Sequence, residues 1–271
     1  MSTGHHIRFN RLLPHDRNAV IVAVDHGEFF GPMPGLIDLP KAVQSVRAAD
    51  AILLSPGMMD HCKATFADRD GPLAILRLNW SSVYCFQWDY KAGHTVDVVT
   101  PEEALALGAD IALASLVLTE TDEDRDAANV ANFARLAAQA RAAGLPIIGE
   151  YFPPEAEKVE REALHETVLP GARILAEVGA HAIKTFYTGD RFAEVTEGCP
   201  VPIFALGAQK LPREIDALNL AHAAIRAGAR GVVFGRNVVQ ARDPAKFLAA
   251  LKQVVRGQAS PDEAAAAAGL R

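Results

Sequence analysis

Short apolar runs alternate with longer, helix-like stretches along almost the whole chain. Runs of this length are typical of buried strands, and parallel strands need helical crossovers between them. Eight such strand-and-helix units predict a closed (β/α)8 barrel, the TIM-barrel fold. The expected strands are Ala19–Val24, Ala51–Leu54, Leu73–Leu78, Asp110–Leu118, Pro146–Phe152, Ala180–Phe186, Pro202–Leu206 and Gly231–Phe234.

The length of the chain agrees with one such barrel. Its 271 residues, of which 50% are hydrophobic, supply enough apolar material for one large core. We therefore expect a single domain over residues 1–257. Residues 258–271 contain Ser260-Pro261-Asp262-Glu263, which is typical of a helix start, followed by a run of Ala. These residues are expected to form a C-terminal helical tail.

Charge and hydropathy exclude several classes of partner. The formal net charge of −6 opposes binding to nucleic acid or to an anionic membrane surface, and no local run of Lys and Arg offsets it. The N-terminal segment 1–10 is polar, and no apolar run reaches the ~18 residues that a membrane span needs. We expect a cytoplasmic protein whose partner is a small molecule.

The spacing of Cys and His gives no metal or redox motif. The three cysteines, Cys62, Cys85 and Cys199, form no CxxC pair, and the nine histidines form no HExxH or HxH pattern. We therefore expect no metal ligands and no cofactor.

Polar or small residues follow six of the expected strands. In TIM barrels the catalytic groups lie at the carboxyl ends of the strands, so these positions are the candidate site. They are Asp25-His26, Asn79, Glu150-Tyr151, Lys184, Gly207-Ala208 and Gly235-Arg236.

Lys184 is the most informative of them because it lies inside the apolar segment Ala180–Phe186. Burial disfavours an ammonium ion and lowers the pKa of lysine from about 10.4 towards about 7–8, and a neutral amine can attack a ketone. The alternative is a structural ion pair with Asp25 or Glu150.

The ends of the seventh and eighth strands predict an anion site. The small residues of Gly207-Ala208 and Gly235-Arg236 let backbone N–H groups approach a phosphate, which barrels often bind after these two strands. Arg236 adds a charge-assisted contact. Asn79 is a further candidate for substrate binding.

Four residues are candidates for proton transfer. Asp25 can position Lys184 or move a proton, and His26 can hydrogen-bond a substrate hydroxyl. Glu150 and Tyr151 are neighbours on one strand, so alternation turns only one of them into the barrel, and position does not choose between them. The aromatic segment 80–96 is expected to form a lid or an oligomer contact.

Several of these segments resemble the archaeal-type class I fructose-bisphosphate aldolases, also called DhnA-type aldolases. The lysine segment is similar to the family's K.YTGD motif, and the last segment is similar to its GRNV.Q motif. The resembling segments are Asp25-His26-Gly27, Gly31-Pro32, Gly35-Leu36, Leu78-Asn79, Lys184–Asp190, Gly207–Lys210 and Gly235–Gln240.

The resemblance implies a TIM-barrel lyase of carbohydrate metabolism that needs no metal and assembles as a homo-oligomer. It also implies that Lys184 forms a Schiff base with a phosphorylated, ketose-like substrate and cleaves or forms a C–C bond. A thiolase or a transaldolase-like synthase acting on the same lysine imine is an alternative, and so is a sugar-phosphate-binding protein without turnover.

The chain departs from the family pattern at two places. Ala208 and Gln209 stand where the GGPK phosphate loop has Gly and Pro. In strand five, alignment on the aromatic residue of the family's W.YPRG motif favours Tyr151 as the proton donor, whereas alignment on Pro153 turns Glu150 inward. We favour Glu150, because an apolar rim is expected to raise the pKa of a carboxyl group until it can both give and take a proton.

Overall fold

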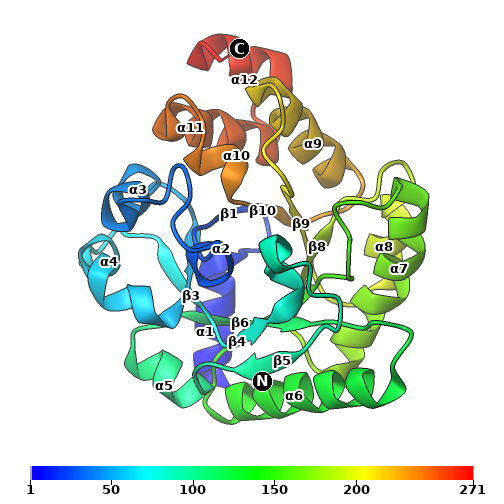
Figure 1. The fold of residues 1–271 in the computed structure, drawn as a ribbon. Helices are drawn as coiled ribbons and strands as arrows, with labels where there is room; N and C mark the ends of the chain where they lie inside the picture. The colour runs from blue at the N-terminus through cyan, green and yellow to red at the C-terminus, as the bar shows by residue number, and fades with distance from the viewer. Residues whose placement is uncertain (1, 271) are drawn as a thin grey trace.

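The computed structural model describes residues 2–270 and contains the expected barrel. Eight parallel strands close in the order β1-β10-β9-β8-β7-β6-β3-β2 (Figure 1). The prediction of a (β/α)8 barrel is therefore confirmed. The strands are β1 (Ala19–Ala23), β2 (Ala51–Leu54), β3 (Leu73–Arg77), β6 (Ile111–Leu116), β7 (Ile147–Tyr151), β8 (Ala182–Phe186), β9 (Ile203–Leu206) and β10 (Gly231–Phe234).

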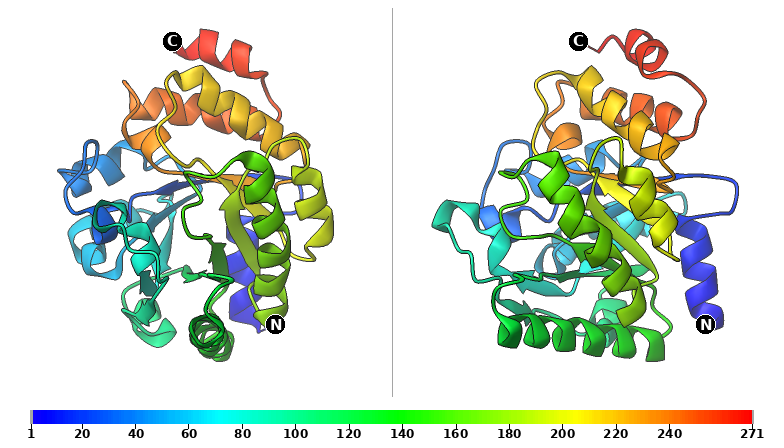
Figure 2. Two further views of the ribbon diagram at one scale, coloured as in Figure 1. Left: turned by 45° about the vertical axis from the view of Figure 1, so that its right-hand side comes forward. Right: turned by 90° about the vertical axis from the view of Figure 1, so that its right-hand side faces the viewer.

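Amphipathic helices surround the strands (Figures 1 and 2). In α6, Phe133, Leu136 and Ala140 recur at helical spacing and are buried. Asp122 caps the first turn of this helix by accepting a hydrogen bond from the amide of Arg125 at 3.0 Å. The main surrounding helices are α3 (Leu39–Ser45), α4 (Met59–Ala67), α5 (Pro101–Ala106), α6 (Glu123–Ala142), α7 (Arg161–Val178), α8 (Phe192–Gly198), α9 (Glu214–Arg226) and α11 (Pro244–Val255).

One face of every strand fills the inside of the barrel. Residues alternate along a strand, so Ile21 belongs to the interior cluster of β1 whereas Val20 and Val22 belong to the cluster under the helices. The interior layer includes Ile75, Leu113, Ile148, Ala182, Phe204 and Val233. Leu12 and Leu13 join this layer from the end of α1 (Thr3–Leu12), which therefore closes the amino end of the barrel (Figure 2).

The aromatic segment after β3 folds as an irregular hairpin at the carboxyl end of the barrel. It consists of β4 (Asn79–Ser81), η2 (Ser82–Tyr84), η3 (Phe86–Trp88) and β5 (Thr95–Asp97), with β4 and β5 antiparallel. Short helix α2 (Gly27–Phe30) packs beside it, with the rings of Phe29 and Tyr84 4.5 Å apart. The segment thus forms one wall of the mouth of the barrel.

The expected C-terminal helix is present as α12 (Pro261–Ala268). Ser260 and Glu263 form the capping box that the sequence indicates. Ala264 and Ala265 are buried in the main core against α9 and α11, so α12 packs onto the barrel. Within residues 2–270, none of the helices has the length and the apolar character needed to cross a membrane.

Candidate active site

The inside of the barrel becomes polar at the carboxyl ends of the strands. Asp25, Arg77, Ser115, Glu150 and Lys184 each lie two positions after an inward-facing apolar residue of the same strand, and all five are buried. Because side chains alternate with a period of two, these five side chains share one layer above the apolar layer. Lys184 and Glu150 are thus brought together, as the sequence indicates.

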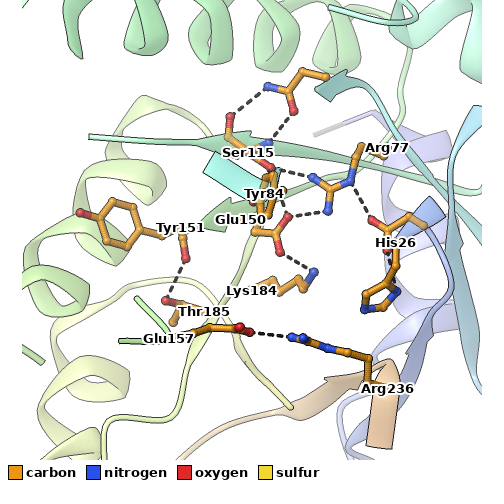
Figure 3. Close-up of polar contacts among 12 residues, drawn as sticks. His26, Arg77, Tyr84, Ser115, Glu150, Tyr151, Glu157, Lys184, Thr185 and Arg236 are labelled. Atoms are coloured by element: carbon orange, nitrogen blue, oxygen red, sulfur yellow. Dashed lines mark hydrogen bonds and ion pairs between the residues drawn. The ribbon is translucent and has the colours of Figure 1, made fainter. Parts of the chain in front are cut away.

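Arg77 is the centre of this polar layer (Figure 3). Its guanidinium donates to Oδ2 of Asp25 at 2.7 Å, to Oε2 of Glu150 at 2.6 Å and to Oγ of Ser115 at 2.7 Å. It also lies 5.1 Å from the ring centroid of Phe29 and 5.2 Å from that of Tyr84. These contacts fix the orientation of both carboxylates.

Ser115 extends the network to the aromatic wall. Its hydroxyl donates to Oε2 of Glu150 at 3.1 Å and lies 2.9 Å from the hydroxyl of Tyr84. Burial raises the pKa of Tyr84 well above its ordinary value, and the charge of Glu150 adds to this effect. The Tyr84 phenol is therefore neutral and acts as a hydrogen-bond donor.

Lys184 forms a close ion pair with Oε1 of Glu150 (Figure 3). Burial alone would raise the pKa of Glu150, but Arg77 and Lys184 outweigh it and hold this pKa well below its ordinary value. Our expectation of a raised pKa is wrong, because closure of the barrel brings Arg77 of β3 beside the carboxylate. Glu150 is therefore an anion paired with Lys184, and its lowered pKa makes it a weak base.

His26 and Asp25 lie on the opposite side of the pocket from Glu150. Nδ1 of His26 is 3.9 Å from Oδ1 of Asp25 and has no hydrogen-bond partner among the described residues. Burial, with smaller contributions from Arg236, Lys184 and Arg77, lowers the pKa of His26 to about 4 against the attraction of Asp25. The imidazole is therefore neutral near neutral pH and is free to bond with a ligand.

Two candidates from the sequence lie away from the pocket. Tyr151 points to the helices, where its ring packs against Gly171 of α7 so closely that a Cβ atom on Gly171 would lie 2.2 Å from Cζ. The side-chain amide of Asn79 forms hydrogen bonds of 2.7 to 3.2 Å with the backbone of Ser115 and the side chain of Asn132. Glu150 faces the pocket and Tyr151 faces outward, which is the orientation we favoured. Neither Asn79 nor Tyr151 lines the pocket, so their inclusion among the site residues is corrected.

The expected phosphate end of the pocket is built differently from the expectation. The amide of Gly207 donates to the carbonyl of Val233 at 3.2 Å, so this N–H is not free for an anion. Gly235 is needed because the ring of His26 packs on it; a Cβ atom there would lie 2.2 Å from Cε1. Ala208 lines the pocket with a φ of 49°, a left-handed conformation that is uncommon for alanine.

Arg236 lines the pocket but already has an anionic partner. Its guanidinium donates to Oε1 of Glu157 at 2.6 Å (Figure 3). The loop before it is clamped by Asn237, whose amide binds the carbonyls of Gly207 and Gln209 and the N–H of Leu211. The positive charge is thus fixed in place at this end.

A single pocket collects these groups at the carboxyl end of the barrel. Its polar lining is Asp25, His26, Arg77, Glu150, Glu157, Lys184 and Arg236, and its aromatic lining is Phe29, Phe30, Tyr84, Phe86 and Phe152. Cations and anions alternate across it, which suits a reaction in which protons move between neighbouring groups. Across residues 2–270, no group of three or more His, Cys, Asp or Glu residues is placed to hold a metal ion.

Our reading of the sequence missed Arg77, Tyr84, Ser115 and Glu157. Two of them carry a signal, because Arg77 and Ser115 interrupt apolar strands at the same phase of the alternation as Glu150 and Lys184. Tyr84 and Glu157 lie in irregular segments and have no periodic signal.

Comparison of the sequence with known proteins gives matches over most of the chain. The family model described as "DeoC/LacD family aldolase" matches residues 19–241. An uncharacterised aldolase of Saccharolobus solfataricus is 30% identical over 268 residues, which is 96% of this chain and 97% of that protein. A 3-hydroxy-5-phosphonooxypentane-2,4-dione thiolase of Yersinia pestis is 32% identical, covering 89% of this chain and 78% of that protein.

Solved structures agree with the sequence matches. A crystal structure of an archaeal fructose 1,6-bisphosphate aldolase superposes with a TM-score of 0.79 at 27% identity, over 93% of this chain and 99% of that chain. A further structure of an archaeal fructose-1,6-bisphosphate aldolase, with the catalytic Lys covalently bound to the carbinolamine intermediate of the substrate, superposes with a TM-score of 0.78 at 28% identity, over 93% of this chain and 100% of that chain.

Proposed function

Because the chain belongs to the DeoC/LacD family of aldolases, we propose that it is a class I aldolase whose Lys184 forms a Schiff base with a phosphorylated, ketose-like substrate. The observation that carries this proposal is the position of Lys184. It lies in a barrel strand, it is buried, and it faces the pocket in contact with the carboxylate of Glu150. The carbinolamine on the catalytic Lys of the archaeal enzyme supports the same chemistry here.

The reaction begins when Lys184 passes a proton to Glu150, a transfer that the lowered pKa of Glu150 makes brief and reversible. The neutral Nζ then attacks the ketone carbon to form a carbinolamine. The proton held by Glu150 is returned to the carbinolamine hydroxyl, which leaves as water, and the resulting iminium ion draws electrons from the adjacent bond. In the cleavage direction, a base removes the proton of the hydroxyl on the β-carbon, the Cα–Cβ bond breaks, and an aldehyde departs. The enamine that remains is protonated at Cα, and water hydrolyses the iminium to release the second product.

Three ionisable groups share the proton transfers in this proposal. Glu150 is the main proton carrier, because it contacts the amine directly; since Arg77 and Lys184 lower its pKa, it holds a proton only briefly. His26 is neutral and unbonded at Nδ1, so it can bind the substrate hydroxyl that loses its proton. Asp25 stabilises the cationic amine and iminium across the pocket, since its pKa is also lowered, with Arg77 and Lys184 overcoming the effect of burial.

The phosphate of the substrate is proposed to bind at Arg236. This guanidinium is the pocket's cation at the end away from Arg77, and a charge-assisted contact there would orient the ketone towards Lys184. The proposal also includes a reaction without a metal ion, in the cytoplasm, by a homo-oligomer. Exposed Trp88 and Tyr90, each more than half exposed, supply an apolar surface suited to such a contact.

Borohydride trapping tests the proposal directly. Incubation with a phosphorylated ketose and borohydride should fix the ketone on Lys184, and mass spectrometry of peptides should locate the adduct. Lys184→Met should abolish trapping. Lys210 is a matched control residue beside the predicted phosphate loop, and an adduct on Lys210 instead would overturn the assignment.

The relatives support one competing activity. The Yersinia pestis protein, and a protein of the same name from Klebsiella pneumoniae at 29% identity, are thiolases. A thiolase would use the same lysine but transfer an acyl group to a thiol. Product analysis with a phosphorylated dione, in the presence and absence of coenzyme A, distinguishes acyl transfer from aldol cleavage.

A further inference from the structure

The guanidinium of Arg236 is paired with a carboxylate of the same chain through one nitrogen, while its Nε has no partner among the described residues. Oε1 of Glu157 accepts its hydrogen bond at 2.6 Å, and Oε2 accepts a second one from the side-chain amide of Gln209 at 2.9 Å. The Glu157 side chain is only 10% exposed and that of Arg236 is 18% exposed. Both residues line the pocket that contains Lys184, on the side away from Glu150 (Figure 3).

The loop that carries Glu157 is held over the pocket mouth by contacts of its own. Its neighbour Ala156 is buried in the main core. Glu155, with a φ of 56°, lies 3.5 Å from Lys91 of the aromatic hairpin. Lys158 lies 3.7 Å from Asp89 of the same hairpin. The burial of Ala156 and the hydrogen bond from Gln209 place the Glu157 carboxylate at Arg236 before any substrate arrives, whereas the exposed pairs of Glu155 and Lys158 add little.

A carboxylate in this place opposes the binding of a phosphate. Both anions need the same guanidinium, and like charges repel strongly in a partly buried pocket. An uncharged hydroxyl meets no such repulsion, because it can donate to Glu157 while the ion pair stays intact. A phosphate and a hydroxyl at this end of the substrate are therefore expected to respond differently to the charge of Glu157.

We propose that Glu157 is a specificity-determining residue, which competes with the substrate's phosphate for Arg236. It thereby reduces the preference of the site for phosphorylated over unphosphorylated ketones. This inference rests on the proposed function, since it takes the ketone to be held at Lys184. A phosphorylated substrate therefore meets the repulsion of the Glu157 carboxylate when it approaches Arg236.

The test compares Glu157→Gln with Glu155→Gln. Both variants remove one negative charge from the same loop, but only the first removes it from Arg236. The probes are dihydroxyacetone phosphate and dihydroxyacetone, whose apparent affinities are measured by the concentration dependence of borohydride trapping at Lys184. We expect Glu157→Gln to bind the phosphorylated ketone about tenfold more tightly, the size of one charge-assisted contact, and the unphosphorylated ketone unchanged. Glu155→Gln should change neither.

Opposite outcomes would overturn the inference. If Glu157 merely positions Arg236, the Glu157→Gln variant will bind dihydroxyacetone phosphate more weakly; if its effect is general, both ketones will change alike. A second measurement, thermal stabilisation by inorganic phosphate, needs no imine. The Glu157→Gln variant should bind inorganic phosphate more tightly, and the additional change Arg236→Gln should abolish this gain. The unaltered protein could fail to trap a ketone while Glu157→Gln still binds inorganic phosphate more tightly through Arg236. That result would count against the proposed function and not against this inference.

Discussion

Replacement of Arg77 by Met should expose how far the buried charges of the active site depend on one another. Arg77 is 1% exposed, and its guanidinium donates to Asp25, Ser115 and Glu150 at 2.6 to 2.7 Å. Met keeps the length of the apolar stem beside Phe29 but supplies no donor. Two buried carboxylates would then have lost their shared cation.

The expected loss of stability is large because the carboxylates cannot reach water. Removing one member of a buried ion pair costs about 3–5 kcal/mol. The loss should stay near one such value, because one carboxyl group will take up a proton when the cation is gone. At about 2–4 °C per kcal/mol for a chain of this size, the Tm should fall by about 6–20 °C.

The pH dependence of this loss has a definite sign. In the unaltered protein the pKa values of Asp25 and Glu150 are lowered, so these groups contribute stability above their unfolded values, and that stability is lost as the pH falls through the folded values. Without Arg77, burial raises the pKa of the one carboxyl group that Lys184 does not neutralise, and a proton taken up there on folding stabilises the variant in acid. The difference in stability should therefore be larger at about pH 7 than at about pH 5.

Thermal unfolding followed by circular dichroism at both pH values is the assay. Arg11→Met is the matched control, because Arg11 pairs with Asp110 at 2.9 Å with its side chain 55% exposed, and exposed pairs contribute only about 0–1 kcal/mol. Arg77→Lys keeps the charge but not the planar set of N–H donors of the guanidinium. Its Tm should lie between those of Arg77→Met and the unaltered protein. The reasoning is refuted if Arg77→Met unfolds like the Arg11 control at both pH values.

Three further predictions concern the site and its support. Glu150→Gln should lower turnover by about 10²–10⁴-fold in steady-state assays, while Tyr151→Phe, whose ring lies outside the pocket, should be nearly silent; a dead Tyr151 variant would refute the assignment. Gly171→Ala forces a Cβ atom against the Tyr151 ring and should destabilise by about 1–3 kcal/mol in urea unfolding, whereas Gly198→Ala meets Leu169 only at 3.6 Å and should not. The folded pKa of His26 is lowered to about 4, so His26 takes up a proton on unfolding between that value and 6.5. The free energy of unfolding should therefore decrease as the pH is lowered through this range. His26→Gln should show a flatter profile by calorimetry, and parallel profiles would contradict the lowered pKa.

The sequence predicts the parts of the site that depend on strand periodicity. Lys184 and Glu150 are found facing the interior because each lies on a regular apolar strand, where a period of two decides direction. Asn79 follows Arg77 at the same phase, but the chain leaves the barrel there to form β4, so its amide bonds with Ser115 backbone instead. Local pattern cannot show where a strand stops.

Charge interactions between distant segments are harder to predict. The pKa of Glu150 follows from Arg77, 73 residues away, and their contact exists only once the barrel has closed. The pairing of Glu157 with Arg236 depends on a loop with a left-handed residue, which no periodicity reveals. Sequence therefore places the nucleophile, while the protonation states around it require the folded structure.

The apolar layer beneath Lys184 has a kinetic consequence. Leu12 and Leu13 of the N-terminal segment complete this layer, so the described chain leaves the pocket a mouth only at the carboxyl end. With the ketone fragment covalently held on Lys184, the aldehyde must leave first through that mouth, and the ketone follows after hydrolysis. Cleavage should then follow an ordered uni–bi scheme, with the ketone product as a competitive inhibitor and the aldehyde as a noncompetitive one.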